Sequence, residues 1–322
     1  MAIRRQIGKP CHQDDGVYVQ LDELARLQHK ASGFSFLPKQ PIHSILSGRL
    51  ASKLRGRGLN FEELRNYLPG DDTRNIDWKV TARTHTPYVR VYTEEKDRTV
   101  WLLVDQRVSM FFGSAKRMKS VVAAEVAALS AWRVLSVGDR VGALVFDDSD
   151  IVVIPPHRSR ERVMQILKQV VEKNQALSAN PGLKPDPDKL NEALKQVRLM
   201  ARHDCLIVLI TDGDGLSPES RRHITGLAEH NDVLIAFIYD PLERKMPAAG
   251  RLRYSDGSGQ LEVDTSNGKL RAAFQNEFEQ RLTWMKSASR RFSIPVLTLH
   301  TNGPVAKQIR DALGHHATGK RF

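Results

Sequence analysis

The fold of this chain is decided by two apolar stretches, VWLLVD from Val100 to Asp105 and CLIVLIT from Cys205 to Thr211. Both stretches are apolar up to their last residue, and each ends in a polar side chain. Uninterrupted apolar strands are typical of parallel sheets whose two faces are both covered by helices. We therefore interpret the two stretches as strands of such a sheet.

Further strand-like runs alternate with helical patterns along the rest of the chain. The strand-like runs are Arg140–Phe146, Ile151–Ile154, Val233–Tyr239 and Ile294–Leu299. The helical patterns are Ser114–Leu135, Arg160–Ala176, Asp188–Met200, a helix that starts at Ser217, Lys269–Arg291 and Pro304–Leu313. This alternation predicts an α/β fold with a doubly wound, mainly parallel sheet.

Changes in composition and in hydrophobic pattern divide the chain into four parts. We expect an N-terminal extension with a short helix over residues 1–43 and a small β-rich subdomain over 44–99. The α/β domain is predicted to cover 100–316, with a polar, glycine-rich hairpin inserted near 243–267, and a basic tail follows over 317–322. Turn residues and short β-like pieces are concentrated in the second part, which predicts a subdomain of strands and loops.

Composition limits the class of protein. Of the 322 residues, 41% are hydrophobic and 27% are charged, which excludes wholesale disorder. Cys11 and Cys205 are too few for a disulfide framework or a four-cysteine zinc site. The N-terminus lacks the apolar stretch of a secretory signal, and the apolar segment 121–137 contains Glu125 and Arg133, so we predict a cytoplasmic protein without a membrane span.

Three acids stand where the predicted strands end: Asp105, Asp212 and Asp240. Open α/β sheets bind ligands beyond the carboxyl ends of their strands, so this edge is the expected site. The sequence has no Gly-x-Gly-x-x-Gly after the first strand, no P-loop, no Gly-x-Ser-x-Gly elbow and no His-Glu-x-x-His. Dinucleotide binding, P-loop ATPase activity and two common hydrolase mechanisms are thereby without support.

The segment DQRVS from Asp105 to Ser109, together with TDG from Thr211 to Gly213, resembles the metal site of von Willebrand factor A domains. In those domains the first strand ends in Asp-x-Ser-x-Ser, and a Thr and an Asp from later loops complete a Mg²⁺ site. The order of strands and helices is also similar, which implies a von Willebrand factor A or Rossmann-like fold.

A longer resemblance is carried by the segment before the first strand. GRGLNFEELRNYLPGDDTRNIDWK, from Gly56 to Lys79, resembles the signature of the bacterial domain-of-unknown-function-58 family, DUF58. The likeness continues through Thr81–Arg83, Tyr88–Arg90 and Glu94–Arg98, and with the sheet pattern it covers about residues 44–240.

The family resemblance implies a function. Members pair a small β-rich segment with a von Willebrand factor A-like domain and are usually encoded beside MoxR-type AAA+ ATPases and other von Willebrand factor A proteins. They are thought to be adaptors in chaperone-like or complex-maturation work. We therefore expect a non-enzymatic protein-interaction component whose partners are a MoxR-type ATPase and other von Willebrand factor A proteins.

The metal-site pattern is altered at two of its five positions. Arg107 occupies the first Ser position, and Asp188 stands where the resemblance places the Thr. Asp105, Ser109 and Asp212 remain as ligands if a metal binds, but an arginine has no lone pair to give, so we expect no cofactor rather than Mg²⁺.

Two interpretations of Arg107 are open. In one, its guanidinium pairs with Asp212, Asp188 or both and replaces the metal, because clustered carboxylates need a compensating charge. In the other, Arg107 points into solvent beside a vestigial site. Under the first interpretation, we predict a partner-binding site of Asp105, Arg107, Ser109, Asp188 and Asp212, in which Arg107 receives a carboxylate of the partner directly.

Two functions of other classes compete with the adaptor. Asp105, Asp212 and Asp214 would bind Mg²⁺ in a phosphoryl-transfer enzyme. A nucleic-acid-binding protein would use the basic C-terminal segment, where eight Lys and Arg between Arg281 and Phe322 face a single acid. No aromatic residues are interleaved with this basic segment in the manner of a nucleic-acid motif, so we interpret it as solvated surface.

Overall fold

A computed structural model describes residues 16–32, 34, 59–94, 97–114, 116–178, 185–255, 260–290 and 294–313. The chain divides into two compact units: a small unit, Gln40–Asp97, and a large unit, Met1–Lys39 with Arg98–Phe322. The predicted basic tail, 317–322, and the part of the family signature before Leu59 lie outside the described residues.

The large unit is built on a six-stranded sheet. Its strands are β3 (Thr99–Asp105), β4 (Arg140–Phe146), β5 (Ile151–His157), β6 (Cys205–Thr211), β7 (Asp232–Tyr239) and β10 (Val296–His300). Their spatial order is β10-β7-β6-β3-β4-β5, and all pairings are parallel except that between β4 and β5. The two stretches that were expected to decide the fold lie side by side at its centre, with Val100 opposite Leu206. The predicted doubly wound, mainly parallel sheet is confirmed.

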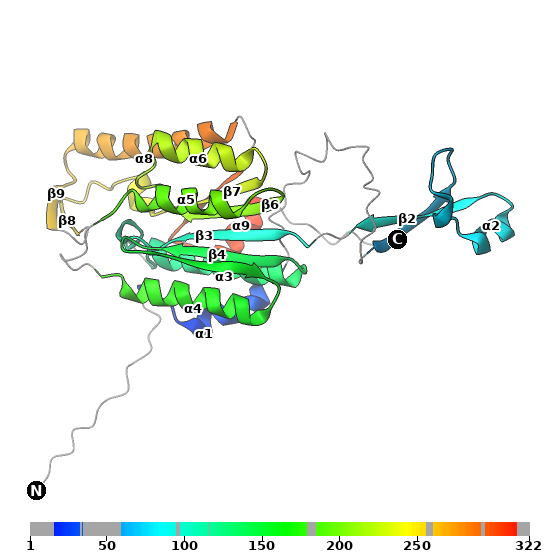
Figure 1. Cartoon of the computed structure of the whole chain (residues 1–322). Coiled ribbons are helices and arrows are strands. Elements are labelled where there is room, and N and C mark those ends of the chain that lie inside the picture. The colour runs from blue at the N-terminus through cyan, green and yellow to red at the C-terminus, as the bar shows by residue number, and fades with distance from the viewer. Residues whose placement is uncertain are drawn as a thin grey trace, which may run out of the picture. The chain divides into compact units, whose positions relative to one another are not determined.

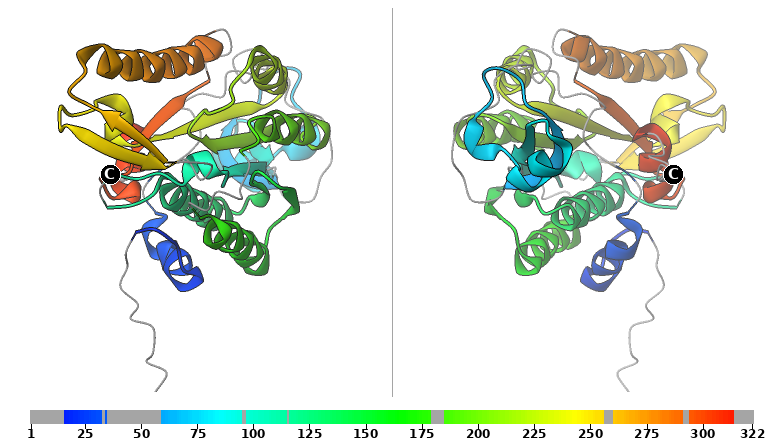
Figure 2. Two further views of the ribbon diagram at one scale, coloured as in Figure 1. Left: turned by 90° about the vertical axis from the view of Figure 1, so that its left-hand side faces the viewer. Right: turned by 90° about the vertical axis from the view of Figure 1, so that its right-hand side faces the viewer.

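Helices cover both faces of this sheet (Figures 1 and 2). One face packs against α3 (Lys119–Ser136), α4 (Arg160–Ala176) and α9 (Val305–Leu313), and the other against α5 (Lys189–Met200), α6 (Pro218–Ala228) and α8 (Gly268–Arg290). Successive side chains of a strand point to opposite faces. Accordingly Val100, Leu102 and Val104 of β3 enter the first core, whereas Trp101 and Leu103 enter the second.

The antiparallel strand β5 forms one edge of the sheet. Its last residues include Pro155 and Pro156, and the pairing register with β4 shifts between Val141 and Ala143 at this point. A Cβ atom on Gly142 would lie 2.7 Å from the nitrogen of Pro156, so only glycine permits this close approach. Prolines are tolerated in sheets mainly on edge strands, because they cannot donate to a second neighbour.

The helix that the pattern places from Ser114 instead begins at Lys119. Both the backbone N–H and the Oγ of Ser114 donate to the carboxylate of Asp240, at 2.9 and 2.5 Å, and this holds the segment in a loop. In addition, the backbone N–H of Met118 donates to the carbonyl of Gly16 and not to that of Ser114, so the first hydrogen bond of a helix from Ser114 is not made.

The short helix predicted near the N-terminus is α1 (Leu21–Arg26), followed by the 3₁₀ turn η1 (Leu27–Lys30). Leu24 is buried in the core that contains α3, and the carbonyl of Leu24 accepts a hydrogen bond from Trp132 Nε1 at 3.1 Å. The backbone N–H of Val19 donates to Asn174 Oδ1 of α4 at 2.9 Å. Residues 16–32 are therefore an integral part of the large unit.

The small unit contains an antiparallel pair, β1 (Leu59–Asn66) and β2 (Tyr88–Glu94), with the turn η2 (Thr73–Asn75) and helix α2 (Trp78–Thr84) between them. Asp77 caps α2 by accepting from the N–H groups of Lys79 and Val80. Ion pairs join Asp77 to Arg90 at 2.8 Å and Arg65 to Asp71 at 2.7 Å. These ion pairs join β1 to the loop before η2, and β2 to the start of α2.

After β7 the chain forms the short helix α7 (Pro241–Arg244) and a hairpin of β8 (Arg251–Ser255) and β9 (Gln260–Asp264). This hairpin lies within the glycine-rich segment for which one was predicted. Of the helices in the described ranges, none has the length and apolar character that a bilayer span requires.

Candidate functional site

The candidate site lies where β3 and β6 end, at the carboxyl edge of the sheet. β3 ends at Asp105 and is followed by the 3₁₀ turn η3 (Val108–Met110), whereas β6 ends at Thr211 and is followed by the loop 212–217. Because the strand order reverses between these two parallel neighbours, their loops diverge and leave their first residues next to each other. Two of the acids predicted from the sequence, Asp105 and Asp212, are thereby brought together.

Arg107 forms a two-armed ion pair with Asp105. Nε of Arg107 donates to Oδ1 of Asp105 at 3.0 Å, and Nη2 donates to Oδ2 at 2.7 Å. The side chains are 1% and 0% exposed. Oδ2 also accepts from Thr211 Oγ1 at 2.7 Å, and Oδ1 from the backbone N–H of Arg107 at 3.0 Å. Both carboxylate oxygens of Asp105 are therefore engaged within the protein.

The remaining donors of Arg107 join two loops to this pair. Nη2 donates to the carbonyl of Asp214 at 2.9 Å, and Nη1 lies 3.5 Å from the carbonyl of Pro187. Burial by itself would lower the pKa of Arg107, but the charge and hydrogen bonds of Asp105, with a contribution from Asp212, raise it above its ordinary value. Arg107 therefore stays protonated at all physiological pH values.

Both sequence-based interpretations of Arg107 need correction. The side chain does not point into solvent, because it is among the largest fully buried side chains of the described residues. Its ion pair is with Asp105 rather than with Asp212 or Asp188. The short connection from Asp105 to Arg107 and the backbone turn between them favour this local partner, because the guanidinium reaches the preceding strand end without crossing the site.

A second buried cation, Lys119, neutralises Asp212. Lys119 is the first residue of α3, and its Nζ donates to Oδ2 of Asp212 and to Oε1 of Glu243, both at 2.8 Å. Lys119 is 3% exposed and Asp212 is 1% exposed at the side chain. Burial alone would raise the pKa of Asp212, but the charges of Lys119 and Arg107 hold it well below its ordinary value. Asp212 is thus an ionised carboxylate.

Neither Lys119 nor Glu243 was predicted from the sequence as a residue of the site. A lysine at the start of an apolar helix is ordinarily interpreted as a solvent-exposed residue. The burial of Lys119 depends on the approach of α7, which follows β7. Glu243 carries a local signal, because Asp240-Pro241-Leu242-Glu243 forms a capping box in which Glu243 Oε2 accepts from the backbone N–H of Asp240. That signal predicts the helix start but not the contact with Lys119.

Ser109 and Asp188 make fewer contacts with the cluster than Asp105, Arg107 and Asp212 do. Ser109 Oγ lies 3.4 Å from Oδ1 of Asp212, and this oxygen also accepts from the backbone N–H of Asp214 at 3.0 Å. Asp188 is exposed and precedes α5 without capping it through its side chain. The structure therefore places Asp105, Arg107, Ser109 and Asp212 in one cluster, whereas Asp188 lies outside it, one residue beyond Pro187.

Asp148 supports the outer side of the cluster. Its Oδ2 accepts from the backbone N–H of Val108 at 2.6 Å, and its Oδ1 accepts from the backbone N–H of Asp186 at 2.8 Å. Burial raises the pKa of Asp148 above its ordinary value in spite of these two hydrogen bonds. The carboxylate joins the loops after β3 and before α5, which are distant in sequence.

Asp240, the third strand-end acid, organises a separate part of the edge. It is fully buried and accepts from Ser114, from Thr301 Oγ1 at 2.6 Å and from the backbone N–H of Leu242 at 2.9 Å. These donors come from three segments that are far apart in the sequence. Asp240 therefore ties together the segments after β3, β7 and β10.

The donor set does not fit the Mg²⁺ ion that the von Willebrand factor A resemblance implies. Such an ion requires oxygen ligands that are free to approach it in near-octahedral geometry. Here the oxygens of Asp105 are taken by Arg107 and Thr211, and those of Asp212 by Lys119, Ser109 and Asp214. Across the described ranges, no group of three or more His, Cys, Asp or Glu side chains is arranged to hold a metal.

Comparisons with known proteins place these observations in context. The model of a family described as "Protein of unknown function DUF58" matches residues 63–283. Uncharacterized proteins of Mycobacterium tuberculosis and Mycobacterium bovis are each 28% identical to this chain over 288 residues, which cover 86% of this chain and 88% of each relative.

Two solved structures are also similar. The conserved hypothetical protein BatB from Bacteroides thetaiotaomicron aligns with a TM-score of 0.41 and 15% identity, over 67% of this chain and 95% of that chain. A von Willebrand factor type A protein from Catenulispora acidiphila aligns with a TM-score of 0.30 and 16% identity, over 47% of this chain and 35% of that chain.

Proposed function

Because the chain belongs to the DUF58 family of proteins of unknown function, we propose that it is a non-enzymatic adaptor that binds another protein through the loops at the carboxyl edge of its sheet. The strand order, with a reversal between β3 and β6, supports this location. The paired acids and cations at the same edge give the loops a defined shape without a cofactor.

The observation that carries the proposal is the neutralisation of two of the three strand-end acids by cations of the chain itself. Arg107 binds Asp105 and Lys119 binds Asp212, each pair being almost fully buried. In this proposal the edge is a degenerate metal-ion-dependent adhesion site, in which organic cations hold the loops that a metal holds elsewhere. Buried ionised groups that are fully paired stabilise one arrangement of their surroundings.

The same pairing speaks against a phosphoryl-transfer enzyme. Such an enzyme needs strand-end carboxylates that are free to bind Mg²⁺ and its substrate. Asp105 and Asp212 are both occupied, and Asp214 contributes its backbone carbonyl to Arg107 while its side chain is exposed. A single exposed carboxylate is a weak basis for metal-assisted catalysis.

Direct recognition of a partner by Arg107 is not compatible with the burial of its side chain. We therefore propose that the partner contacts the exposed residues of the loops around Arg107. Asp188 and Asp214 have exposed side chains, and Ser109 is half-buried in the turn after β3. Asp105, Arg107 and Asp212 then act as positioning residues that hold these loops. Exposed carboxylates favour lysine and arginine side chains on the partner.

The partner in this proposal is the class that the family resemblance suggests, a MoxR-type AAA+ ATPase, together with other von Willebrand factor A proteins. The test uses the purified full chain and the purified MoxR-type ATPase from the same organism in a biolayer interferometry titration. We expect Asp188→Lys combined with Asp214→Lys to weaken binding by about tenfold or more, because two favourable charges become repulsive. Glu277→Lys on α8, an exposed acid outside the site, is the matched control and leaves binding unchanged.

Two results would overturn the proposal. One is the absence of any interaction with the ATPase at concentrations of about 100 μM. The dissociation constant would then exceed about 100 μM, which corresponds to weaker binding than a transient protein complex has. The other is Mg²⁺-dependent hydrolysis of a phosphate ester that disappears in Asp105→Asn, which would establish the enzyme instead.

A further inference from the structure

The small unit carries an exposed tryptophan that the proposed adaptor site does not use. Trp78, the first residue of α2, is 69% exposed, and Leu68 in the preceding loop is 58% exposed. Large apolar side chains with this exposure lose the free energy that burial would provide. Tryptophan is also the residue most enriched among the anchors of protein interfaces.

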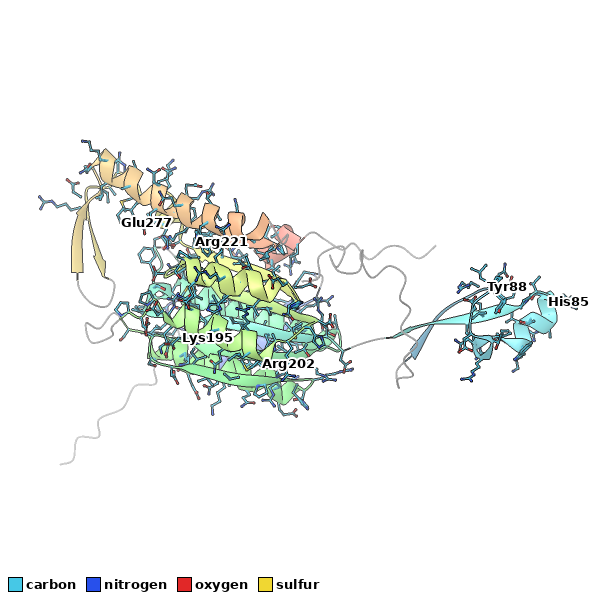
Figure 3. All side chains as sticks on the ribbon, turned by 45° about the horizontal axis from the view of Figure 1, so that its top comes forward. His85, Tyr88, Lys195, Arg202, Arg221 and Glu277 are labelled. Carbon is cyan, nitrogen blue, oxygen red and sulfur yellow. The ribbon has the colours of Figure 1, made fainter. Side chains whose placement is uncertain are left out.

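The helix turns Trp78 and two cations to the same side. At 100° per residue, Trp78, Ala82, Lys79 and Arg83 occupy one continuous arc of α2. All four side chains are exposed, whereas Val80 and Thr81 on the opposite arc are half-buried. Figure 3 shows the side chains around this helix, beside the labelled His85 and Tyr88. We call the arc of Trp78, Lys79, Ala82 and Arg83 the α2 face.

The charges of the small unit are distributed unequally between the α2 face and its surroundings. Asp71 is paired with Arg65, and Asp77 is paired with Arg90 and caps α2. Asp72 accepts from the backbone N–H of Arg74. Within the described part of the chain, the ammonium of Lys79 and the guanidinium of Arg83 have no ion-pair partner. These three aspartates are thus engaged within the unit, while the cations beside Trp78 are available.

We propose that the α2 face is a second docking site, which binds an acidic segment of another protein. Carboxylates of the segment pair with Lys79 and Arg83, and an apolar side chain of the segment packs on the indole of Trp78. Charge complementarity of this kind gives specificity and fast association, and the aromatic anchor supplies most of the affinity.

Nucleic acid is a poorer occupant. The small unit, residues 40–97, contains ten Lys and Arg against eight Asp and Glu, a formal charge of only +2, and within 59–94 the acids outnumber the cations by six to five. The unit therefore lacks the strongly positive charge of nucleic-acid-binding domains. Sites for single strands also stack successive bases on several aromatic side chains. Among the side chains that the structure describes in this unit, Trp78 is the only exposed aromatic, and Tyr67 and Tyr88 are half-buried.

The experiment selects ligands for the full chain from a phage-displayed library of random dodecapeptides, with Trp78→Ala as the counter-selection protein. We expect the enriched peptides to contain several Asp or Glu residues next to an apolar residue. A fluorescein-labelled version of the most enriched peptide is then titrated by fluorescence anisotropy. Trp78→Ala and the charge reversal Lys79→Glu with Arg83→Glu each weaken binding by about tenfold or more.

Matched controls exclude unspecific effects. Lys195→Glu reverses an exposed charge on α5 of the large unit (Figure 3), and Leu199→Ala removes a side chain that is 75% exposed; both leave the titration unchanged. Because Trp78 is exposed, its replacement leaves folding intact, and an unchanged circular dichroism spectrum verifies this.

The proposal is overturned if no peptide is enriched in a Trp78-dependent manner, if the enriched peptides are basic, or if labelled oligothymidylate binds the same residues more tightly than the peptide. These outcomes are independent of the carboxyl-edge site, because the variants at Asp188 and Asp214 retain the α2 face. Failure of the ATPase titration and failure of the peptide selection therefore test different surfaces.

Discussion

Arg107 binds Asp105, two residues before it in the chain, through Nε and Nη2 at 3.0 and 2.7 Å, and both side chains are buried. A two-armed pair of this kind fixes the orientation of both groups. Its contribution to stability is asymmetric, because removal of one partner leaves the other as an uncompensated buried charge. Single and double substitutions of the pair should therefore differ in their free energies of unfolding.

Replacement of Arg107 by methionine is expected to lower the free energy of unfolding by about 3 to 5 kcal/mol, because Asp105 then remains buried without its cation. Urea denaturation followed by circular dichroism measures the change. Adding Asp105→Asn to the same chain recovers part of the loss, since the buried charge is removed as well. A loss below about 1 kcal/mol, the range of exposed ion pairs, would contradict the buried pairing.

Replacement of Arg107 by serine restores the Asp-x-Ser-x-Ser order of the metal-binding pattern. We expect this variant to be less stable than the original chain and to regain part of its melting temperature when Mg²⁺ or Mn²⁺ is added, because a divalent ion then replaces the lost guanidinium. The original chain shows no such rise. Stoichiometric Mg²⁺ binding by the original chain in isothermal titration calorimetry, abolished by Asp105→Asn, would refute the surrogate role of Arg107.

Lys119→Met is expected to destabilise the fold by about 3 to 5 kcal/mol at neutral pH, because Asp212 and Glu243 lose their shared cation. In the original chain the pKa of Asp212 is lowered, so its contribution is present above the ordinary aspartate pKa and is lost as the pH falls. In the variant, burial without Lys119 disfavours the ionised form of Asp212. The difference between the two chains therefore shrinks from pH 7 to pH 4, which urea titrations at both values detect; a constant difference would argue against ionised Asp212.

Gly215 in the loop after β6 has a φ of +73°, and a Cβ atom there would lie 2.6 Å from the carbonyl oxygen of Pro187. Gly215→Ala is therefore expected to reduce the free energy of unfolding by about 2 to 4 kcal/mol, from backbone strain plus overpacking. Gly250, with a φ of +77° and no atom within 4 Å of the added Cβ, is the matched control. Gly250→Ala costs about 1 kcal/mol from strain alone. Equal losses of unfolding free energy in the two variants would show that the backbone of Pro187 moves away from the added Cβ atom at no cost in free energy.

The sheet and its two helical layers were predictable from the sequence, because the strands are apolar over their whole length and the helices between them are long. Residues near the strand ends were predictable for the same reason: parallel strands bring their carboxyl ends to one edge. Asp105 and Asp212 therefore lie where the pattern places them, whereas the predicted pairing of Arg107 with Asp212 or Asp188 was wrong, because its ion pair is with Asp105.

The partners within the site were not predictable to the same degree. Arg107 pairs with Asp105 because the backbone turns back over two residues, and periodicity carries no information about such a turn. Lys119 meets Asp212 and Glu243 only after three separate segments have been assembled by the fold. Contacts of this type depend on tertiary packing, and a lysine beside an apolar helix gives no local sign of burial.

The two adjacent prolines in β5 have a consequence for association between molecules. A β-strand at the border of a sheet exposes N–H and C=O groups that can pair with a strand of another chain and start an amyloid-like ribbon. Pro155 and Pro156 contribute no N–H group, and the irregular register beside Gly142 interrupts the flat geometry that strand addition needs. This border therefore resists sheet-to-sheet polymerisation.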